Sequence, residues 1–278
     1  MSEHFRAFSF VDRITSVQKG SRIQGRYFIP PGLKDFPTSL AAEAVGQLAA
    51  WASMEATDFE RRPIAGLAGR IDLLGAARPG QVLELAADVE SLDAEAVVYR
   101  GLAMIDGTVV VRLTDCVGPM IPVIDLDEPT ALRDRFTLLR GPGAVPEGFR
   151  GLPPLSLHLA EGEIGQCKQA TFNVPATAAM FEDHFPRRPV FPGSLLMQKL
   201  LELATALSAE ISPAPRRWRP QTILNMKLRE FIPPGKSLEL EARLKQSANE
   251  SARVTIGSRA GKEVVSSACL LLTPEDGL

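Results

Sequence analysis

Two stretches of this 278-residue chain decide its fold: FPTSLAAEAVGQLAAWASM at 36–54 and FPGSLLMQKLLELATALSA at 191–209. Phe, Pro, Ser and Leu recur in their first five positions at a shift of 155 residues. The first stretch is apolar on nearly all sides, which is typical of a helix buried inside a domain. The two stretches predict one long buried helix in each half of the chain, at about 39–54 and 194–209.

The shift of 155 residues also holds beyond the two helices. It aligns RPGQVLEL at 78–85 with PPGKSLEL at 233–240, and Val109-Val110 with Val264-Val265. One shift that holds without slippage from 36 to 110 indicates an internal duplication. We therefore expect two copies of one domain, at 1–140 and 155–278, joined by a Gly/Pro-rich linker at 141–154.

Runs with the polar/apolar alternation of β-strands surround each predicted helix. A single helix followed by a meander of antiparallel strands predicts a sheet that wraps the helix. The fold class expected is α+β, with two such units fused as a pseudodimer. The expected strand regions are 8–17, 69–74, 81–91, 96–105 and 108–117 in the first copy, and 155–164, 222–231, 237–246, 252–259 and 263–272 in the second.

Composition limits the classes of partner and the compartment. The formal net charge of −2 gives no reason to expect nucleic acid or an anionic membrane as the partner. No stretch approaches the ~20 apolar residues of a membrane span, and the first residues lack the apolar core of a signal peptide. Three cysteines lie far apart in the sequence. They indicate reduced thiols in the cytoplasm, not a disulfide or zinc framework.

Glu43 is the only ionisable side chain between Thr38 and Met54. A lone carboxylate on so apolar a helix is costly unless it is paired or protonated, and burial favours the protonated form that a general acid requires. Gln47, four residues further on, lies on the same helical face and is placed to hold one carboxylate oxygen. The alternative is that Glu43 points from a helix end into water.

His184 lies in FEDHFPRRPVFPG at 181–193, between a pair of acids and a proline-rich turn. Gly193 then begins the helix, where unpaired backbone N–H groups can bind a developing oxyanion. The alternative is a histidine with a purely structural role. That alternative is our interpretation of His4, in an expected loose terminus, and of His158, in an alternating strand.

The duplication suggests how the acid and the base meet. At the shift of 155 residues, His184 corresponds to Ile29, and Glu43 corresponds to Gln198. Each copy thus holds one half of an acid–base pair. If the copies pack with two-fold symmetry, one composite site contains His184 and Glu43, and the other contains Ile29 and Gln198. The sequence predicts one active site and one inactive site.

The stretch HFPRRPVFPGSLLMQKL at 184–200 resembles the HFPG-[KR]-P-xx-PG-xxxx-E segment of the β-hydroxyacyl-acyl-carrier-protein dehydratases, which are hot-dog fold enzymes of fatty-acid synthesis. FSFVDRITSVQKGSRI at 8–23 is similar to their opening strand, and 36–50 is similar to their helix. The resemblance implies a fused double hot dog in which Glu43 of one half serves His184 of the other. It also implies an oxyanion donor at the Gly193 N–H and an orienting carbonyl at Val190.

Two positions depart from the family pattern. The glycine that follows HFP in the family is Arg187 here, which makes the mouth of the site more basic. The first half has Thr38 where the family has the glycine of PG. Polyketide dehydratase domains look similar as fused pairs, but their histidine half comes first.

The resemblance implies dehydration of 3-hydroxyacyl thioesters of acyl carrier protein or CoA to trans-2-enoyl thioesters, in fatty-acid or polyketide synthesis. No metal or organic cofactor is expected, because the substrate carries the phosphopantetheine arm. No nucleic acid or membrane partner is expected, and a homodimer of the fused pair is one expected assembly. Two alternatives stay open, a hot-dog acyl thioesterase and a non-catalytic acyl- or carrier-binding subunit. The residues expected at the substrate and at a basic mouth are Phe191, Pro192, Arg187, Arg188, Arg216, Arg217 and Arg219, although an arginine run is also typical of a solvated loop.

Overall fold

A computed structural model describes residues 4–145, 148–160, 162–211, 218–247 and 251–274. Its first half contains β1 (Arg13–Gln18), β2 (Arg22–Phe28), α1 (Thr38–Ala56), β3 (Arg61–Pro63), β4 (Leu67–Leu73), β5 (Val82–Leu92), β6 (Ala96–Ile105), β7 (Thr108–Pro122), the 3-10 helix η1 (Val123–Asp125) and α2 (Pro129–Arg140). Its second half contains β8 (Leu157–Ala160), β9 (Cys167–Asn173), α3 (Met180–Asp183), α4 (Gly193–Ile211), β10 (Trp218–Leu228), β11 (Ser237–Ser247), β12 (Ala252–Ala260) and β13 (Glu263–Pro274).

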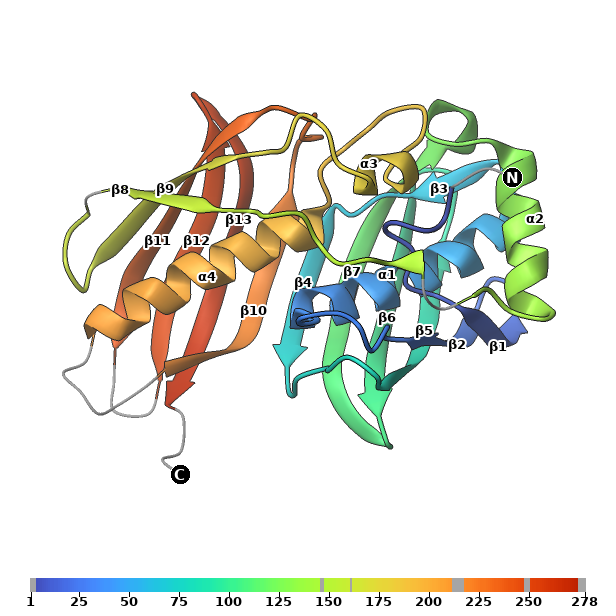
Figure 1. Ribbon diagram of the computed structural model, residues 1–278, viewed down its shortest axis with the longest axis horizontal. Helices are drawn as coiled ribbons and strands as arrows, with labels where there is room; N and C mark the ends of the chain where they lie inside the picture. Colours follow the sequence, from blue (N-terminus) through green and yellow to red (C-terminus); the bar gives the residue numbers. More distant parts are fainter. Residues whose placement is uncertain (1–3, 146–147, 161, 212–217, 248–250, 275–278) are drawn as a thin grey trace.

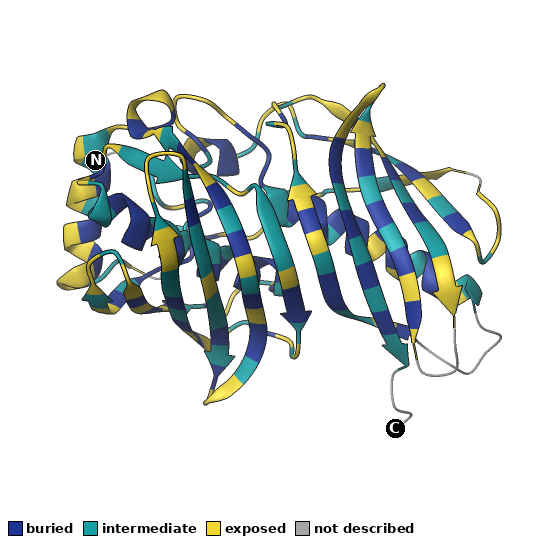
Figure 2. Cartoon of the chain, turned by 180° about the vertical axis from the view of Figure 1, so that it is seen from behind, coloured by how far each residue is buried: buried dark blue, intermediate teal, exposed yellow. Residues whose placement is uncertain are grey.

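The two halves share one antiparallel sheet of 13 strands, in the order β1-β2-β5-β6-β7-β4-β10-β13-β12-β11-β9-β8, with β3 paired to β7. They join where β4 pairs with β10, for example at Ile71 and Ile223. The helices α1 and α4 lie on one face of this sheet and contact each other (Figure 1). Seen from behind, the strands carry alternating buried and exposed positions (Figure 2). The predicted covered face of the sheet is the one that packs on the helices.

The duplication is visible in the bounds of the elements. The shift of 155 residues relates both ends of α1 to those of α4, and both ends of β5 to those of β11. In contrast, β2 and β9 are related by a shift of 145 residues. Ten additional residues therefore lie between β9 and α4, where the chain forms α3 and the turn that carries His184.

This difference corrects one correspondence drawn from the sequence. The N–H of Ile29 donates to the carbonyl of Gln81, and the N–H of Val174 donates in the same way to Lys236, both at 2.9 Å. Gln81 and Lys236 are related by the shift of 155 residues, so Val174 is the structural counterpart of Ile29. His184 has no counterpart in the first half, because the segment that carries it is missing there.

Helix α1 is held by apolar burial. Leu40, Val45 and Leu48 are fully buried against the sheet, and each such side chain contributes ~1.5–3 kcal/mol relative to leaving it in water. Glu43 lies half-buried on the same helix. The predicted helices 39–54 and 194–209 are confirmed, each with one or two more residues at its ends. The fold therefore holds the carboxylate rigidly in place.

Two elements differ from the sequence expectation. The predicted strand 8–17 is β-structure only from Arg13, because residues 8–12 leave the sheet and run toward the second half. Helix α2 was not predicted, although Leu132, Phe136 and Leu139 recur at helical spacing and are buried. The three cysteines are free thiols, as expected. No described helix is long and apolar enough to cross a membrane.

Candidate active site

His184 is fixed by the turn that follows α3. Its backbone carbonyl accepts the Val190 N–H at 2.8 Å, and its Nδ1 lies 2.9 Å from the Val190 carbonyl oxygen. Because a carbonyl can only accept a hydrogen bond, Nδ1 carries the proton, and in the neutral ring Nε2 keeps its lone pair. Burial lowers the pKa of His184 below its usual value, although the Glu43 carboxylate opposes this. The imidazole is therefore neutral and basic at Nε2 at pH 7.

Glu43 is held by Gln47, one turn further along α1. The Gln47 amide donates to the Glu43 carboxylate at 3.0 Å and to the Phe8 carbonyl at 3.1 Å, while its oxygen accepts the Phe10 N–H at 2.8 Å. These three bonds fix the orientation of the amide. One oxygen of the carboxylate is consequently tied to a rigid donor.

His184 and Glu43 line the same cavity, so the structure brings together two side chains that come from different halves. The cavity has a volume of about 200 Å³. It follows α1 from Ala42 to Met54, a helix length of ~18 Å, and Tyr99 and Leu113 of the first half also line it. Such an apolar channel with few polar groups is typical of a site for a small organic ligand.

Gly193 lines this cavity as the first residue of α4. Its N–H has no partner within the helix, because the first backbone donors of a helix lack acceptors. A side chain here would place its Cβ 2.2 Å from the Leu228 Cδ1 atom, and Leu228 also lines the cavity. Only glycine fits without moving the cavity wall.

The other residues expected at the substrate take different positions. Phe191 lines the cavity, but Pro192 is buried outside the lining, where its carbonyl accepts the Leu195 and Leu196 N–H groups that begin α4. Pro192 thus has a structural position. The prediction for Phe191 agrees with its position.

Arg187 and Arg188 are exposed at the edge of the site and do not line the cavity. The Arg187 guanidinium donates to the Ile124 carbonyl at 2.8 Å and pairs with Glu128. Arg188 lies over the ring of Phe231, 4.2 Å from its centroid, and Phe231 lines the cavity. Both arginines are therefore rim residues, and Arg187 also ties the two halves together.

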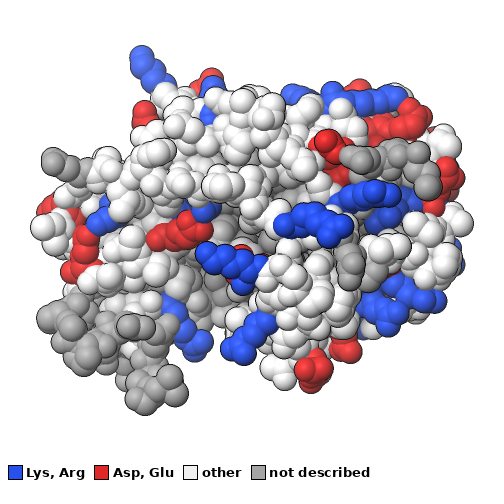
Figure 3. Space-filling view, in the orientation of Figure 1, with Lys and Arg blue, Asp and Glu red and all other residues white. Residues whose placement is uncertain are grey.

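The remaining arginines proposed for the mouth divide into two cases. Arg219 is wrong as a mouth residue, because it lies nine residues along β10 from the cavity residue Leu228, or ~30 Å at the rise of a strand. Arg216 and Arg217 lie outside the described residues. In Figure 3, basic side chains gather around the middle and right of one face, with acidic side chains scattered among them.

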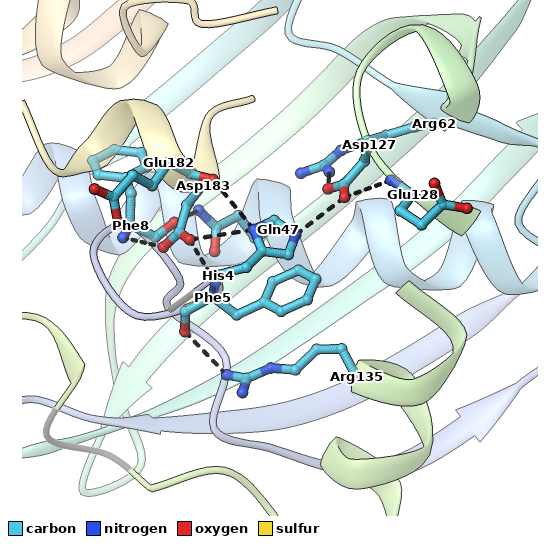
Figure 4. A network of polar contacts seen from close by, with 10 residues as sticks. All are labelled: His4, Phe5, Phe8, Gln47, Arg62, Asp127, Glu128, Arg135, Glu182 and Asp183. Atoms are coloured by element: carbon cyan, nitrogen blue, oxygen red, sulfur yellow. Dashed lines mark hydrogen bonds and ion pairs between the residues drawn. The ribbon is translucent and has the colours of Figure 1, made fainter. Parts of the chain in front are cut away.

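Four charged residues beside the site were missed or misjudged from the sequence. Arg62 donates to Asp127 at 3.0 Å and lies 4.4 Å from the ring centroid of Phe185. His4 was expected in a loose terminus, and this is wrong: it lies 3.1 Å from Asp127 and 3.5 Å from Asp183 (Figure 4). These partners are far apart in the sequence, so no local pattern could have paired them.

No group of three or more His, Cys, Asp or Glu side chains among the described residues is placed to hold a metal ion. The expectation that the protein needs no cofactor stays a prediction.

Residues 161–268 match the family model of ApeI-like dehydratases, described as ApeI dehydratase. Over 79 residues the chain is 35% identical to the 3-hydroxyacyl-[acyl-carrier-protein] dehydratase FabZ of Bradyrhizobium diazoefficiens, a match that covers 27% of this chain and 49% of the relative. The FabZ of Nitrobacter winogradskyi is 37% identical over 79 residues, with 27% and 50% covered. The chain spans about half the length of the curated relatives it matches.

Among solved structures, a putative oleoyl thioesterase from Lactobacillus plantarum superimposes with a TM-score of 0.61 at 9% identity, covering 93% of this chain and 97% of that one. A tesB protein of Mycobacterium avium subspecies paratuberculosis superimposes with a TM-score of 0.59 at 12% identity, covering 95% and 96%. These likenesses concern the fold alone. With the sequence matches, they confirm the α+β hot-dog fold and the resemblance to the dehydratase family.

Proposed function

We propose that this protein is a dehydratase that converts 3-hydroxyacyl thioesters to trans-2-enoyl thioesters at one composite site between its halves. The observation that carries this proposal is the fixed imidazole of His184. Its Nδ1 is held on the Val190 carbonyl, and its Nε2 is left as a base in a cavity shared with Glu43. The sequence matches to dehydratases support the same reaction.

In the proposed reaction, Nε2 of His184 removes a proton from C2 of the thioester. The electron pair of the broken C2–H bond forms the C2=C3 double bond, and the C3–O bond breaks. Glu43 in its acid form gives a proton to the departing hydroxyl, which leaves as water. The proton on His184 then returns to Glu43 through solvent, so the protein ends as it began. Acid and base steps of this kind contribute ~10²–10⁴-fold each to the rate.

The Gly193 N–H is the proposed donor to the thioester carbonyl. Charge develops on that oxygen as the C2 proton leaves, and a preorganised backbone donor is worth ~3–4 kcal/mol in such a position. The positive end of the α4 dipole acts in the same direction.

The acyl group is proposed to lie along α1, where the lining is apolar. The thioester would arrive from acyl carrier protein or CoA in the cytoplasm, past Arg188 at the rim. The cavity of about 200 Å³ is smaller than the ~300–1,000 Å³ of common ligand sites. This size favours an acyl group without bulky substituents.

The experiment is to incubate the protein with a 3-hydroxyacyl thioester and follow the enoyl product by absorbance and mass. We expect turnover in the wild type, and a loss of at least ~10²-fold in His184→Ala and in Glu43→Gln. Gln198→Ala is the matched control, because Gln198 occupies the position of Glu43 in the other helix and should lose little.

Unchanged turnover in either site variant would refute the composite site. Release of free thiol without enoyl product would select the thioesterase alternative. Binding without any turnover would select the non-catalytic alternative.

A further inference from the structure

We propose that residues 4–10 form a bracket that positions both catalytic side chains at once. The bracket holds Asp183, the neighbour of His184, and it holds Gln47, the partner of Glu43. This inference rests on the proposed function only for the words catalytic and turnover, because the contacts themselves are features of the fold. Residues 4–10 have no secondary structure of their own, so their position depends on these contacts.

On the histidine side, the bracket fixes the carboxylate of Asp183. The Phe8 N–H donates to one carboxylate oxygen at 2.7 Å, and the Phe5 N–H donates to the other. Asp183 is buried and ends α3, directly before His184. Holding this carboxylate therefore holds the backbone from which the imidazole projects.

On the glutamate side, the bracket fixes the amide of Gln47. The Phe8 carbonyl accepts from the Gln47 nitrogen at 3.1 Å, and the Phe10 N–H donates to its oxygen at 2.8 Å. The second hydrogen of that nitrogen is thereby directed at Glu43, 3.0 Å away. Phe8 thus takes part in both arms, with its N–H toward Asp183 and its carbonyl toward Gln47.

The rings of the bracket also contact the site directly. The Phe8 ring meets the His184 imidazole edge to face, with centroids 5.7 Å apart. Phe5 and Phe8 both line the cavity. Movement of the bracket would consequently change the base, the acid and the acyl channel together.

His4 anchors the end of the bracket by charge. It lies between Asp127, which precedes α2 in the first half, and Asp183 of the second half (Figure 4). Asp127 is also paired with Arg62, and both aspartates are buried. A buried carboxylate without a cation is strongly disfavoured. Removing the His4 charge should therefore release Asp183 before it releases Asp127.

The test compares His4→Ala, His4→Lys and the matched control His158→Ala, since His158 is exposed on β8. Each is assayed well below its melting temperature. We expect kcat of His4→Ala to fall ~10–100-fold, the cost of a small misplacement of reacting groups, with KM changed far less. His4→Lys keeps a cation between the aspartates and should recover most of kcat, and His158→Ala should match the wild type. Asp183→Asn, with Asp125→Asn as its exposed control, gives a second pair that keeps the shape of the side chain.

A second readout does not depend on turnover. The chain has three histidines, so ¹⁵N-labelled imidazoles give three ring signals that the variants assign. We expect the Nδ1–H signal of His184 to be sharp in the wild type and in His4→Lys, and broadened in His4→Ala.

If the wild type does not dehydrate the substrate but this broadening occurs, the proposed function fails and the bracket stands. If His4→Ala changes neither kcat nor the His184 signal, and only lowers the melting temperature, the bracket is overturned.

Discussion

At the scale of the residue, the hydrogen bond from Nδ1 of His184 to Val190 decides what the imidazole can do. A ring that donated from Nε2 instead would present no lone pair to the cavity. Val190 comes six residues after His184, at the end of a proline-rich turn. The orientation of the base is thus a property of the local turn, whereas its environment is set by both halves.

The pH dependence of turnover should report this environment. Burial lowers the pKa of His184 below the usual 6.5, so the imidazole stays neutral down to a pH below that value. We expect kcat/KM to be constant through neutral pH and to fall only as the pH drops through the lowered pKa. A pH–rate profile measures this. An acid limb centred at or above 6.5 would contradict the assignment of His184 as the buried base.

Sequence reasoning found the residues whose partners lie close along the chain or at a fixed repeat spacing. Gln47 follows Glu43 by one helical turn, and Val190 shares a turn with His184. It did not find Arg62, Asp127 or Asp183, and it placed His4 in a loose terminus. These four groups meet only after the two halves have packed, and a charged side chain has the same local pattern whether it is buried or solvated.

At the scale of the element, α1 and α4 are superimposable copies that differ at the channel. Gly46 lines the cavity beside Tyr99, and a Cβ at Gly46 would lie 3.5 Å from the Tyr99 hydroxyl. The same positions in the second half are Leu201, which is buried, and Val254. One helix thus leaves room for a channel, and the other fills the equivalent space.

The difference predicts that Gly46→Leu will shorten the channel. An alanine would fit against Tyr99, but a leucine extends further, into the cavity. We expect kcat/KM to fall steeply for long 3-hydroxyacyl thioesters and little for short ones, because only the long chains reach past this position. Comparing a short and a long substrate on the same enzyme measures this, and the short substrate serves as the control. An equal loss for both would show that the acyl chain takes another path.

The segment 4–10 should make stability depend on pH. Burial alone would lower the pKa of His4, but the hydrogen bonds and charges of Asp127 and Asp183 raise it to about 9. Because this pKa is higher in the folded than in the unfolded state, the stabilisation is complete below about 6.5 and is lost as the pH rises through about 9. Arg62 stays charged throughout this range.

The size of this contribution can be bounded. The shift from 6.5 to about 9 corresponds to at most ~3 kcal/mol, and partial screening by solvent reduces it to ~1–2 kcal/mol. Urea unfolding at a series of pH values should show the wild type more stable than His4→Gln by this amount at pH 6, with the difference vanishing above pH 9. The exposed variant His158→Gln should show no such trend. A constant difference between wild type and His4→Gln would mean that His4 contributes only through packing.

At the scale of the whole molecule, the fusion has allowed the two halves to diverge. In a dimer of identical chains every site would carry the same residues. Here the first half keeps the acid, the bracket and the channel, while the second half keeps the ten residues with His184. The repeat in the sequence revealed the division of the acid and the base. It could not reveal the missing ten residues, because a shift of 155 happens to place Ile29 opposite His184.

This divergence predicts one functional site per chain that cannot be doubled by a point mutation. Gln198 occupies the position of Glu43, but the half that faces it lacks the histidine segment, and Leu201 fills the channel. Gln198→Glu should therefore leave kcat unchanged. A non-reactive thioether analogue of the substrate should bind with a stoichiometry of one per chain, measured by calorimetry, in the wild type and in Gln198→Glu. His184→Ala should keep this stoichiometry, because it removes the base and not the channel. A stoichiometry of two would mean that the second half forms an acyl channel of its own, and the division of labour between the halves would then be wrong.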